Sequence, residues 1–373
     1  MYQLILFDVD GVFLSEERCF DASALAVWEL LYAPHFLHIR DNSFSTTPKE
    51  EEIREIRKKV FQNDTILDWM KDRGINANWD MVYLVFTAQL MHALKAVEKS
   101  YAKEWLSNPI TEDSLSELKE YIRGFDPDFR SFFSIFDETN GKLNRDELLV
   151  YFNSYVKEHF GVEVDYFSRI STLWEIGSSV YQEWYFGEEL FLEEEGYTRT
   201  KGKQGFLFQE IPLAPLAELR QLLADLQVKQ IALGIGTGRP WLEMEVPLRE
   251  MGLLDYFHPN RVITATDVVL AEKQYPKEAP LGKPHPYTYL LGFLGKEAAD
   301  NIALQYPLPI EEGHRILVVG DSVADFLAAQ KLGFHFAATL TGLTGQEARG
   351  KFEELGADYI LDDVRQLRSV VMA

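Results

Sequence analysis

The segment from Leu4 to Val12 constrains the fold of this chain more than any other. It is a short apolar run that changes abruptly to the sequence Asp8, Val9, Asp10, Gly11. Apolar residues without polar alternation are typical of a central parallel strand covered on both faces. Open parallel sheets bind their ligands beyond the carboxyl ends of such strands. The segment therefore predicts a buried strand whose end lies at a functional site.

Asp8 and Asp10 are the candidate functional residues of this segment. Two acids two residues apart in an extended chain point the same way, so their charges repel unless a cation or a shared proton intervenes. Oxygen ligands beside a substrate phosphate favour Mg²⁺. Alternatively, both side chains only cap the turn that follows the strand. On this segment alone, both interpretations stay open.

Length and charge limit the classes of function. The chain has 373 residues, more than the roughly 250 to 300 at which single cores stop growing, so we expect two domains. It carries 37 basic and 59 acidic side chains and a net charge of −22, which disfavours nucleic-acid partners and anionic membranes. The most apolar long segment, 81–94, is shorter than the roughly 20 residues that span a bilayer, so we expect no membrane insertion.

Cysteine usage and the N-terminal residues predict a cytoplasmic protein. Cys19 is the one cysteine, so the chain forms no intramolecular disulfide, as is usual in a reducing compartment. The sequence begins directly with the predicted strand and has no basic segment or long apolar segment of a secretory signal.

The order of the predicted elements indicates an α/β fold with an insertion. From Asp21 to about Gly187 the apolar spacing is helical, with Asp21 as a possible helix cap and the glutamate-rich stretch from Glu188 to Gly205 as a return linker. Strands and helices alternate after it, which predicts a doubly wound parallel sheet. The first strand has no parallel partner before residue 230. We therefore predict a core domain of residues 1–16 and 206–373, and an inserted, mainly α-helical domain of residues 17–205.

One segment of the inserted block resembles an EF-hand loop. Counted from Asp137, the loop places Gly141 at position five and Glu147 at position eleven. An EF-hand needs its glycine at position six and a bidentate glutamate at position twelve. We therefore interpret the segment as a helix-turn-helix that does not bind calcium, with Asn140-Gly141 as the turn.

Three later segments match the end of the first strand. The strand that precedes Thr237 and Gly238 ends in a hydroxyl flanked by glycines, where a helix N-terminus and backbone N–H groups can bind phosphate. Lys283 stands between Gly282 and Pro284, which restrict its backbone, and a fixed cation there can neutralise carboxylates and bind a phosphoryl oxygen. The alternatives are an ordinary strand-to-helix turn and a solvated lysine.

The last of these segments is another apolar strand that ends in carboxylates. Asp321 stands at its end, and Asp325 follows one helical turn later, where the two side chains can face each other.

In this order, the four motifs resemble those of the haloacid dehalogenase-like (HAD) superfamily, over the whole predicted sheet domain. The resemblance implies that Asp8 is the nucleophile and Asp10 the general acid and base. It implies that Thr237, with Gly238, and Lys283 bind phosphate. Its Mg²⁺ site involves the Asp8 carboxylate, the backbone carbonyl of Asp10 and an acid among Asp321 and Asp325. An acid at position 10 resembles the phosphatases and phosphomutases of the superfamily.

We therefore expect Mg²⁺-dependent hydrolysis of a small phosphorylated metabolite through an aspartyl-phosphate on Asp8. The inserted block resembles a HAD cap, and we expect it to close over the site and exclude bulky substrates. A phosphomutase acting on a sugar phosphate is the first alternative. The second is a binding or regulatory protein on a HAD scaffold. The substrate and the oligomeric state stay open.

Overall fold

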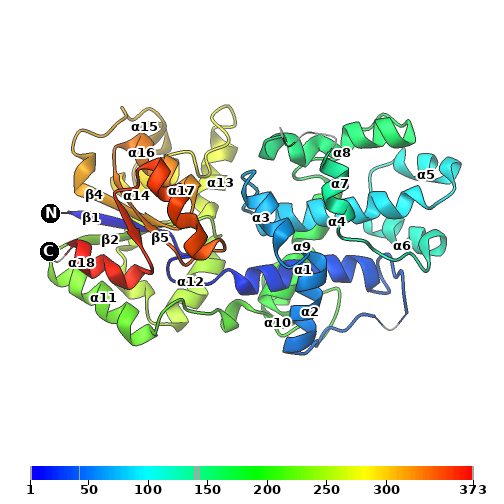
Figure 1. The fold of residues 1–373 in the computed structure, drawn as a ribbon, viewed down its shortest axis with the longest axis horizontal. Coiled ribbons are helices and arrows are strands. Elements are labelled where there is room, and N and C mark those ends of the chain that lie inside the picture. Colours follow the sequence, from blue (N-terminus) through cyan, green and yellow to red (C-terminus); the bar gives the residue numbers. More distant parts are fainter. Residues whose placement is uncertain (1, 42, 138–140, 142, 372–373) are drawn as a thin grey trace. The chain divides into compact units, whose positions relative to one another are not determined.

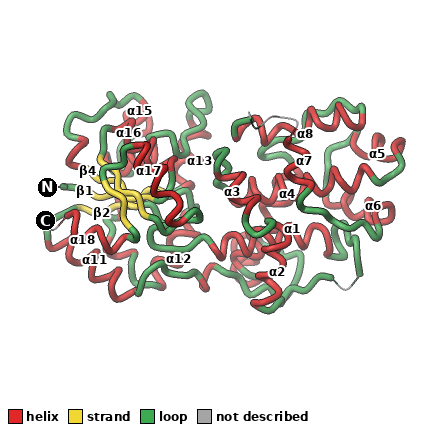
Figure 2. Tube along the Cα trace, viewed as in Figure 1, coloured by secondary structure: helices red, strands yellow, loops and turns green. Residues whose placement is uncertain are grey.

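One parallel sheet forms the centre of the N- and C-terminal parts of the chain (Figures 1 and 2). The computed structural model describes residues 2–41, 43–137, 141 and 143–371. Within them the chain divides into two compact units. Unit 1 comprises residues 1–16 and 207–373, and unit 2 comprises residues 17–206.

The described residues of unit 1 contain six strands in the order β3-β2-β1-β4-β5-β6, and every pairing is parallel. The strands are β1 (Leu4–Phe7), β2 (Ala232–Gly236), β3 (Val262–Ile263), β4 (Ile316–Gly320), β5 (His335–Thr339) and β6 (Tyr359–Leu361). All four residues of β1 are buried, and β1 pairs with β2 on one side and β4 on the other. The prediction of a doubly wound parallel sheet with a buried first strand is confirmed.

Alternate residues of β1 belong to the two cores on opposite faces of the sheet. The helices of unit 1 are α11 (Leu216–Val228), α12 (Trp241–Glu250), α13 (Ala265–Gln274), α14 (Tyr287–Leu294), α15 (Asp300–Leu304), α16 (Val323–Leu332), α17 (Arg349–Leu355) and α18 (Leu367–Val371). Ile5 and Phe7 pack in the core that includes α11, α12 and α18, whereas Leu4 and Leu6 pack in the core that includes α13 to α17.

Unit 2 is helical, and its described residues form no strand (Figure 2). Its helices are α1 (Glu17–Tyr32), α2 (Glu50–Val60), α3 (Thr65–Lys71), α4 (Asn78–Lys95), α5 (Lys99–Leu106), α6 (Glu112–Ile122), α7 (Ser131–Asp137), α8 (Arg145–Phe160), α9 (Thr172–Phe186) and α10 (Glu188–Glu195). The long helix α1 packs against α2, α4 and α9.

Two predictions within this block are wrong. Asp21 does not cap a helix, because α1 already begins at Glu17; Asp21 is buried inside it and pairs with Arg18 at 3.1 Å. The glutamate-rich stretch after Gly187 is not a linker throughout, since its first eight residues form α10. Phe191 is fully buried and fixes this helix to the unit.

The EF-hand-like segment runs from the last residue of α7 into the first turn of α8, and its residues 138–140 and 142 are outside the described residues. The Glu147 side chain accepts a bond from the Asn144 backbone N–H at 2.9 Å, and Asn144 accepts from the N–H groups of Asp146 and Glu147. This capping box starts α8. The absence of calcium binding stays a prediction.

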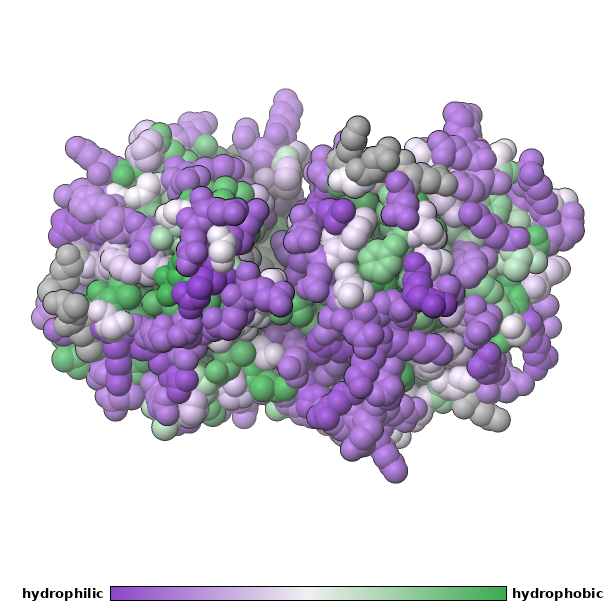
Figure 3. Space-filling model, in the orientation of Figure 1, coloured by the Kyte–Doolittle hydropathy of each residue, from purple (hydrophilic) through white to green (hydrophobic). Residues whose placement is uncertain are grey.

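The displayed face of either unit is mostly hydrophilic, with scattered apolar side chains (Figure 3). None of the helices in the described part of the chain has the length and apolar character needed to cross a membrane.

Candidate active site

The ends of β1, β2 and β4 lie at the same edge of the sheet. Phe7, the last residue of β1, is in register with Ile235 of β2 and Val319 of β4. The Asp8 backbone N–H donates to the Val319 carbonyl at 2.8 Å, which extends the pairing by one residue. The side chains that follow these strands are therefore brought together.

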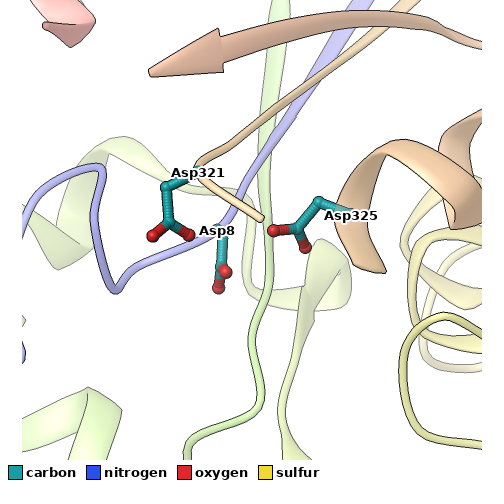
Figure 4. Close-up of side chains that lie close together, drawn as sticks. All are labelled: Asp8, Asp321 and Asp325. Atoms are coloured by element: carbon teal, nitrogen blue, oxygen red, sulfur yellow. The ribbon is translucent and has the colours of Figure 1, made fainter. Parts of the chain in front are cut away.

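Three carboxylates meet at this edge. Figure 4 shows the Asp8 carboxylate between those of Asp321 and Asp325. One oxygen from each lies within 4.8 Å of the others, and Asp8 and Asp325 are buried. Like charges so close repel strongly, so the group requires cations or a shared proton.

Lys283, on the loop between α13 and α14, supplies one of these cations. Its Nζ lies 3.0 Å from Asp8 Oδ2 and 2.7 Å from Asp325 Oδ1. Burial raises the pKa of the Asp8 carboxyl above its usual range, although Lys283 opposes this effect. Burial alone would lower the pKa of Lys283, but the two carboxylates raise it above its usual value. Lys283 is therefore a permanent cation.

Asp325 uses both carboxylate oxygens within the protein. Oδ1 accepts from Lys283 and from the Tyr289 hydroxyl, each at 2.7 Å, and Oδ2 accepts from the Ser322 hydroxyl at 2.6 Å. Burial alone would raise the pKa of Asp325, but Lys283 and these hydrogen bonds hold it below its usual value. Asp325 thus fixes Lys283 and caps α16 together with Ser322.

The Asp10 side chain lies in a different environment. It is not part of the three-carboxylate group and instead accepts from Arg239, at 2.9 Å from Nε and 2.6 Å from Nη2 to Oδ1. The Asp10 side chain keeps 24% of its surface exposed. The two acids that follow β1 are therefore paired with different cations.

Thr237 and Gly238 follow β2 as predicted. The Thr237 backbone N–H donates to the Ile263 carbonyl at 3.0 Å, and its hydroxyl accepts from the Arg239 N–H at 3.1 Å. The first bond continues the pairing of β2 with β3, and the second closes a short turn in which Thr237 is buried and Gly238 exposed. The Thr237 hydroxyl hydrogen can be donated to an anion at the end of the sheet.

Residues 2–333 match the family model of the haloacid dehalogenase-like hydrolases. The chain belongs to this family. No curated protein matches the chain.

Among solved structures, the HAD-like chain is similar to a crystal structure from the Northeast Structural Genomics Consortium, whose description names no activity. The identity is 36% and the TM-score is 0.82, and the match covers 100% of this chain and 98% of the other. The YfnB protein of Bacillus subtilis, described as a HAD hydrolase bound to magnesium, is 17% identical with a TM-score of 0.39 over 100% and 99% of the two chains. A predicted phosphoglycolate phosphatase from Haemophilus somnus is 13% identical with a TM-score of 0.40 over 99% and 97%.

Three side chains of this HAD-like site do not follow from the sequence pattern. Arg239 contacts Asp10, Tyr289 contacts Asp325, and Ser322 caps α16. The sequence does contain a hint of Arg239, because this basic residue stands two positions after Thr237 in a site that is otherwise predicted to be acidic. It contains no hint of Tyr289, since the contact of Tyr289 depends on how α14 packs beside α16.

Proposed function

We propose that this protein hydrolyses a phosphate monoester with Mg²⁺, with Asp8 as nucleophile and Asp10 as general acid and base. The observation that carries the proposal is the separation of the two acids. Asp8 is buried with Lys283 and two further carboxylates, whereas Asp10 is paired with Arg239 and partly exposed. Two acids in different environments can take different roles in one reaction.

The donor set fits Mg²⁺. Asp8, Asp321 and Asp325 offer only oxygen ligands and, when all three are ionised, carry three negative charges against the one positive charge of Lys283. A divalent cation offsets the excess, and Mg²⁺ favours a few carboxylates together with water and phosphate oxygens. Because Asp325 already accepts hydrogen bonds from three side chains, Lys283, Tyr289 and Ser322, we propose Asp8, the Asp10 carbonyl and Asp321 as its protein ligands. When bound, Mg²⁺ offsets charge on the phosphoryl oxygens.

The proposed reaction has two steps. In the first, an Asp8 oxygen attacks phosphorus, the bond from phosphorus to the ester oxygen breaks, and Asp10 gives its proton to the leaving oxygen. In the second, Asp10 takes a proton from a water molecule that attacks the aspartyl-phosphate, which releases inorganic phosphate and regenerates Asp8. Lys283 and the Thr237 hydroxyl stabilise the phosphoryl oxygens in both steps.

The proposed substrate is a small phosphorylated metabolite. A chain with a net charge of −22 repels polyanions, so substrates are attracted by local cations such as Lys283. We further propose that unit 2 acts as the cap that selects among substrates.

A screen of phosphorylated metabolites with Mg²⁺ tests this function. We expect phosphate release that stops when Mg²⁺ is chelated and when Asp8 is replaced by Asn. Product analysis of the best substrate separates hydrolysis from transfer, because a phosphomutase returns an isomeric phosphate ester. Phosphate release by Asp8→Asn at the rate of the unmodified protein would contradict the proposal.

A further inference from the structure

The Arg239 guanidinium connects the Asp10 carboxylate to a buried glutamate. Arg239 is only 4% exposed. Its Nε and Nη2 donate to Asp10, and its Nη1 donates to Glu210 Oε1 at 2.8 Å and to the Glu243 backbone carbonyl at 3.2 Å. All three nitrogens therefore have acceptors, and these acceptors come from three separate segments of unit 1.

Glu210 lies in a segment that is hydrogen-bonded to the loop that contains Asp10. It lies just after the short helix η1 (Leu207–Gln209), where the chain returns to unit 1. Backbone bonds join this segment to the loop after β1: the Ser15 N–H donates to the Ile211 carbonyl at 2.8 Å, and the Leu213 N–H donates to the Phe13 carbonyl at 2.9 Å. Arg239 is thus anchored by a segment that is fixed relative to Asp10.

Glu210 gives Arg239 a second acidic partner besides Asp10. Its side chain is fully buried against Arg239, and breaking a buried ion pair is strongly unfavourable. Arg239 is therefore anchored through Nη1, independently of the bonds that Nε and Nη2 donate to Asp10.

The contacts are also unequal between the two oxygens of Asp10. Oδ1 accepts from Nε and Nη2, at 2.9 and 2.6 Å, whereas the one bond that Oδ2 accepts among the described residues comes from Nε at 3.1 Å. Planar, forked donors fix the orientation of a carboxylate better than an ammonium does. The arrangement holds one oxygen firmly and leaves the other with a single longer bond.

We propose that Arg239 is a positioning residue that orients the Asp10 carboxyl for proton transfer, and that Glu210 holds Arg239 in that orientation. The inference rests on the proposed function, because it acts through the general acid and base. Arg239 does not touch the substrate in this proposal. It fixes Asp10 so that Oδ2 exchanges protons with the leaving group and with water.

Two aryl phosphates test the inference. p-Nitrophenyl phosphate has a leaving group that departs with little protonation, whereas phenyl phosphate needs the acid. We expect Arg239→Lys to lower kcat/KM on phenyl phosphate by about 10-fold to 100-fold and kcat/KM on p-nitrophenyl phosphate by less than about threefold, because kcat/KM reports the step that expels the leaving group. The value of kcat also contains the hydrolysis of the aspartyl-phosphate, in which Asp10 is the base, and should fall on both esters. Arg261→Lys is the matched control, since Arg261 is a part-buried arginine of unit 1 that donates to the Gly292 and Phe293 carbonyls and should not change the ratio.

The Asp10→Asn background distinguishes positioning from a structural role. Without the acid, Arg239→Lys should cause no further loss on either ester, because the effect of Arg239 passes through Asp10. An equal loss of kcat/KM on both esters in the protein that keeps Asp10, or a further loss of kcat/KM in the Asp10→Asn protein, would overturn the inference. If Arg239→Lys does not fold, Glu210→Gln takes its place and should show the same dependence on the leaving group.

Failure of the proposed function would look different. In that case the unmodified protein would release no phosphate from either ester with Mg²⁺, and Asp8 would not become phosphorylated. An active protein whose Arg239 and Glu210 variants keep the original ratio between the two esters would contradict the inference alone.

Discussion

Asp321 is enclosed by backbone on two sides. A Cβ atom at Gly11 or at Gly342 would overlap its carboxylate. Thr339 and Thr341 donate their hydroxyls to the Gly11 carbonyl at 2.9 and 2.5 Å, which fixes the loop that carries this glycine. The position of Asp321 is therefore set by residues that do not themselves bind the proposed metal.

Gly342→Ala should accordingly weaken Mg²⁺ binding. The new methyl group displaces Asp321, and changes that reorient a ligand typically lower metal affinity by about 10-fold to 100-fold. Isothermal titration with Mg²⁺ measures this without substrate. Gly350→Ala is the matched control, because a Cβ there meets no atom within 4 Å; equal affinities for the two variants would contradict the prediction.

Glu243 should make the stability of unit 1 depend on pH. Burial raises the pKa of Glu243 from 4.5 to about 8, Arg239 lowers it, and Asp10 and Glu210 raise it further. Its Oε1 has no hydrogen-bond partner among the described residues. Between these two pH values the folded protein holds a proton that the unfolded chain has lost, so the folding free energy becomes less favourable as pH rises, by about 1.4 kcal/mol per pH unit.

The Glu243→Gln variant removes this dependence. We expect its melting temperature to exceed that of the unmodified protein by an amount that grows from pH 5 to pH 8, since the amide has no proton to lose. Glu250→Gln, an exposed position on the same helix, provides the control and should show no such growth. A constant difference between the Glu243 variant and the unmodified protein across this range would show that Glu243 is not a buried neutral acid.

At the scale of elements, the sequence predicts those whose pattern is local. The apolar runs of β1, β2 and β4 and the residues at their ends follow from composition and period alone. The edge strand β6 was not predicted, because two of its three residues are only partly buried. Helix α10 was misread for the opposite reason: its glutamates suggest a linker, and one buried side chain, Phe191, decides the outcome. Contacts such as Tyr289 with Asp325 depend on packing between distant elements and have no local pattern.

The helix α9 and the returning chain of unit 2 are joined by a buried ion triad. Lys203 Nζ lies 2.7 Å from Glu29 Oε2 and 2.9 Å from Glu183 Oε2, and all three side chains are 0% exposed. Burial alone would raise the pKa of Glu183, but Lys203 and further hydrogen bonds hold it below its usual value. The triad depends on its single cation.

Lys203→Met should therefore destabilise unit 2 strongly, by about 3 to 5 kcal/mol, because it leaves two buried carboxylates without their cation. Urea unfolding followed by tryptophan fluorescence reports on this unit, since every tryptophan except Trp241 lies within residues 17–206. Lys201→Met, at an exposed position, should change stability by no more than about 0.5 kcal/mol. Similar unfolding midpoints for the two variants would refute the role of the triad.

At the scale of the whole molecule, unit 1 has complete cores of its own. Both clusters that cover the sheet consist of unit 1 residues only. The segments where the chain leaves and re-enters the unit are bonded to each other, through Phe13 with Leu213 and Ser15 with Ile211. The two ends of unit 1 at residues 16 and 207 are therefore close enough to be joined without a long loop.

A chain in which a short flexible linker replaces residues 17–206 should fold cooperatively and still bind Mg²⁺. Circular dichroism during thermal unfolding and titration with Mg²⁺ measure the two properties. An unfolded product would show that unit 1 depends on unit 2 for its stability. The role of unit 2 in substrate selection stays a proposal. Comparing the order of substrate preference of the shortened chain with that of the full chain tests it.

The central claim is that Asp8 receives a phosphoryl group, and trapping that group tests it most directly. The protein is mixed with p-nitrophenyl phosphate and Mg²⁺, quenched in acid, and its peptides are analysed by mass spectrometry. We predict one phosphoryl group on Asp8, accumulating further in Asp10→Asn because water is no longer activated, and none when Mg²⁺ is chelated. Phosphate release without any phosphorylated Asp8 in either protein, or with the phosphoryl group on another residue, would contradict the account.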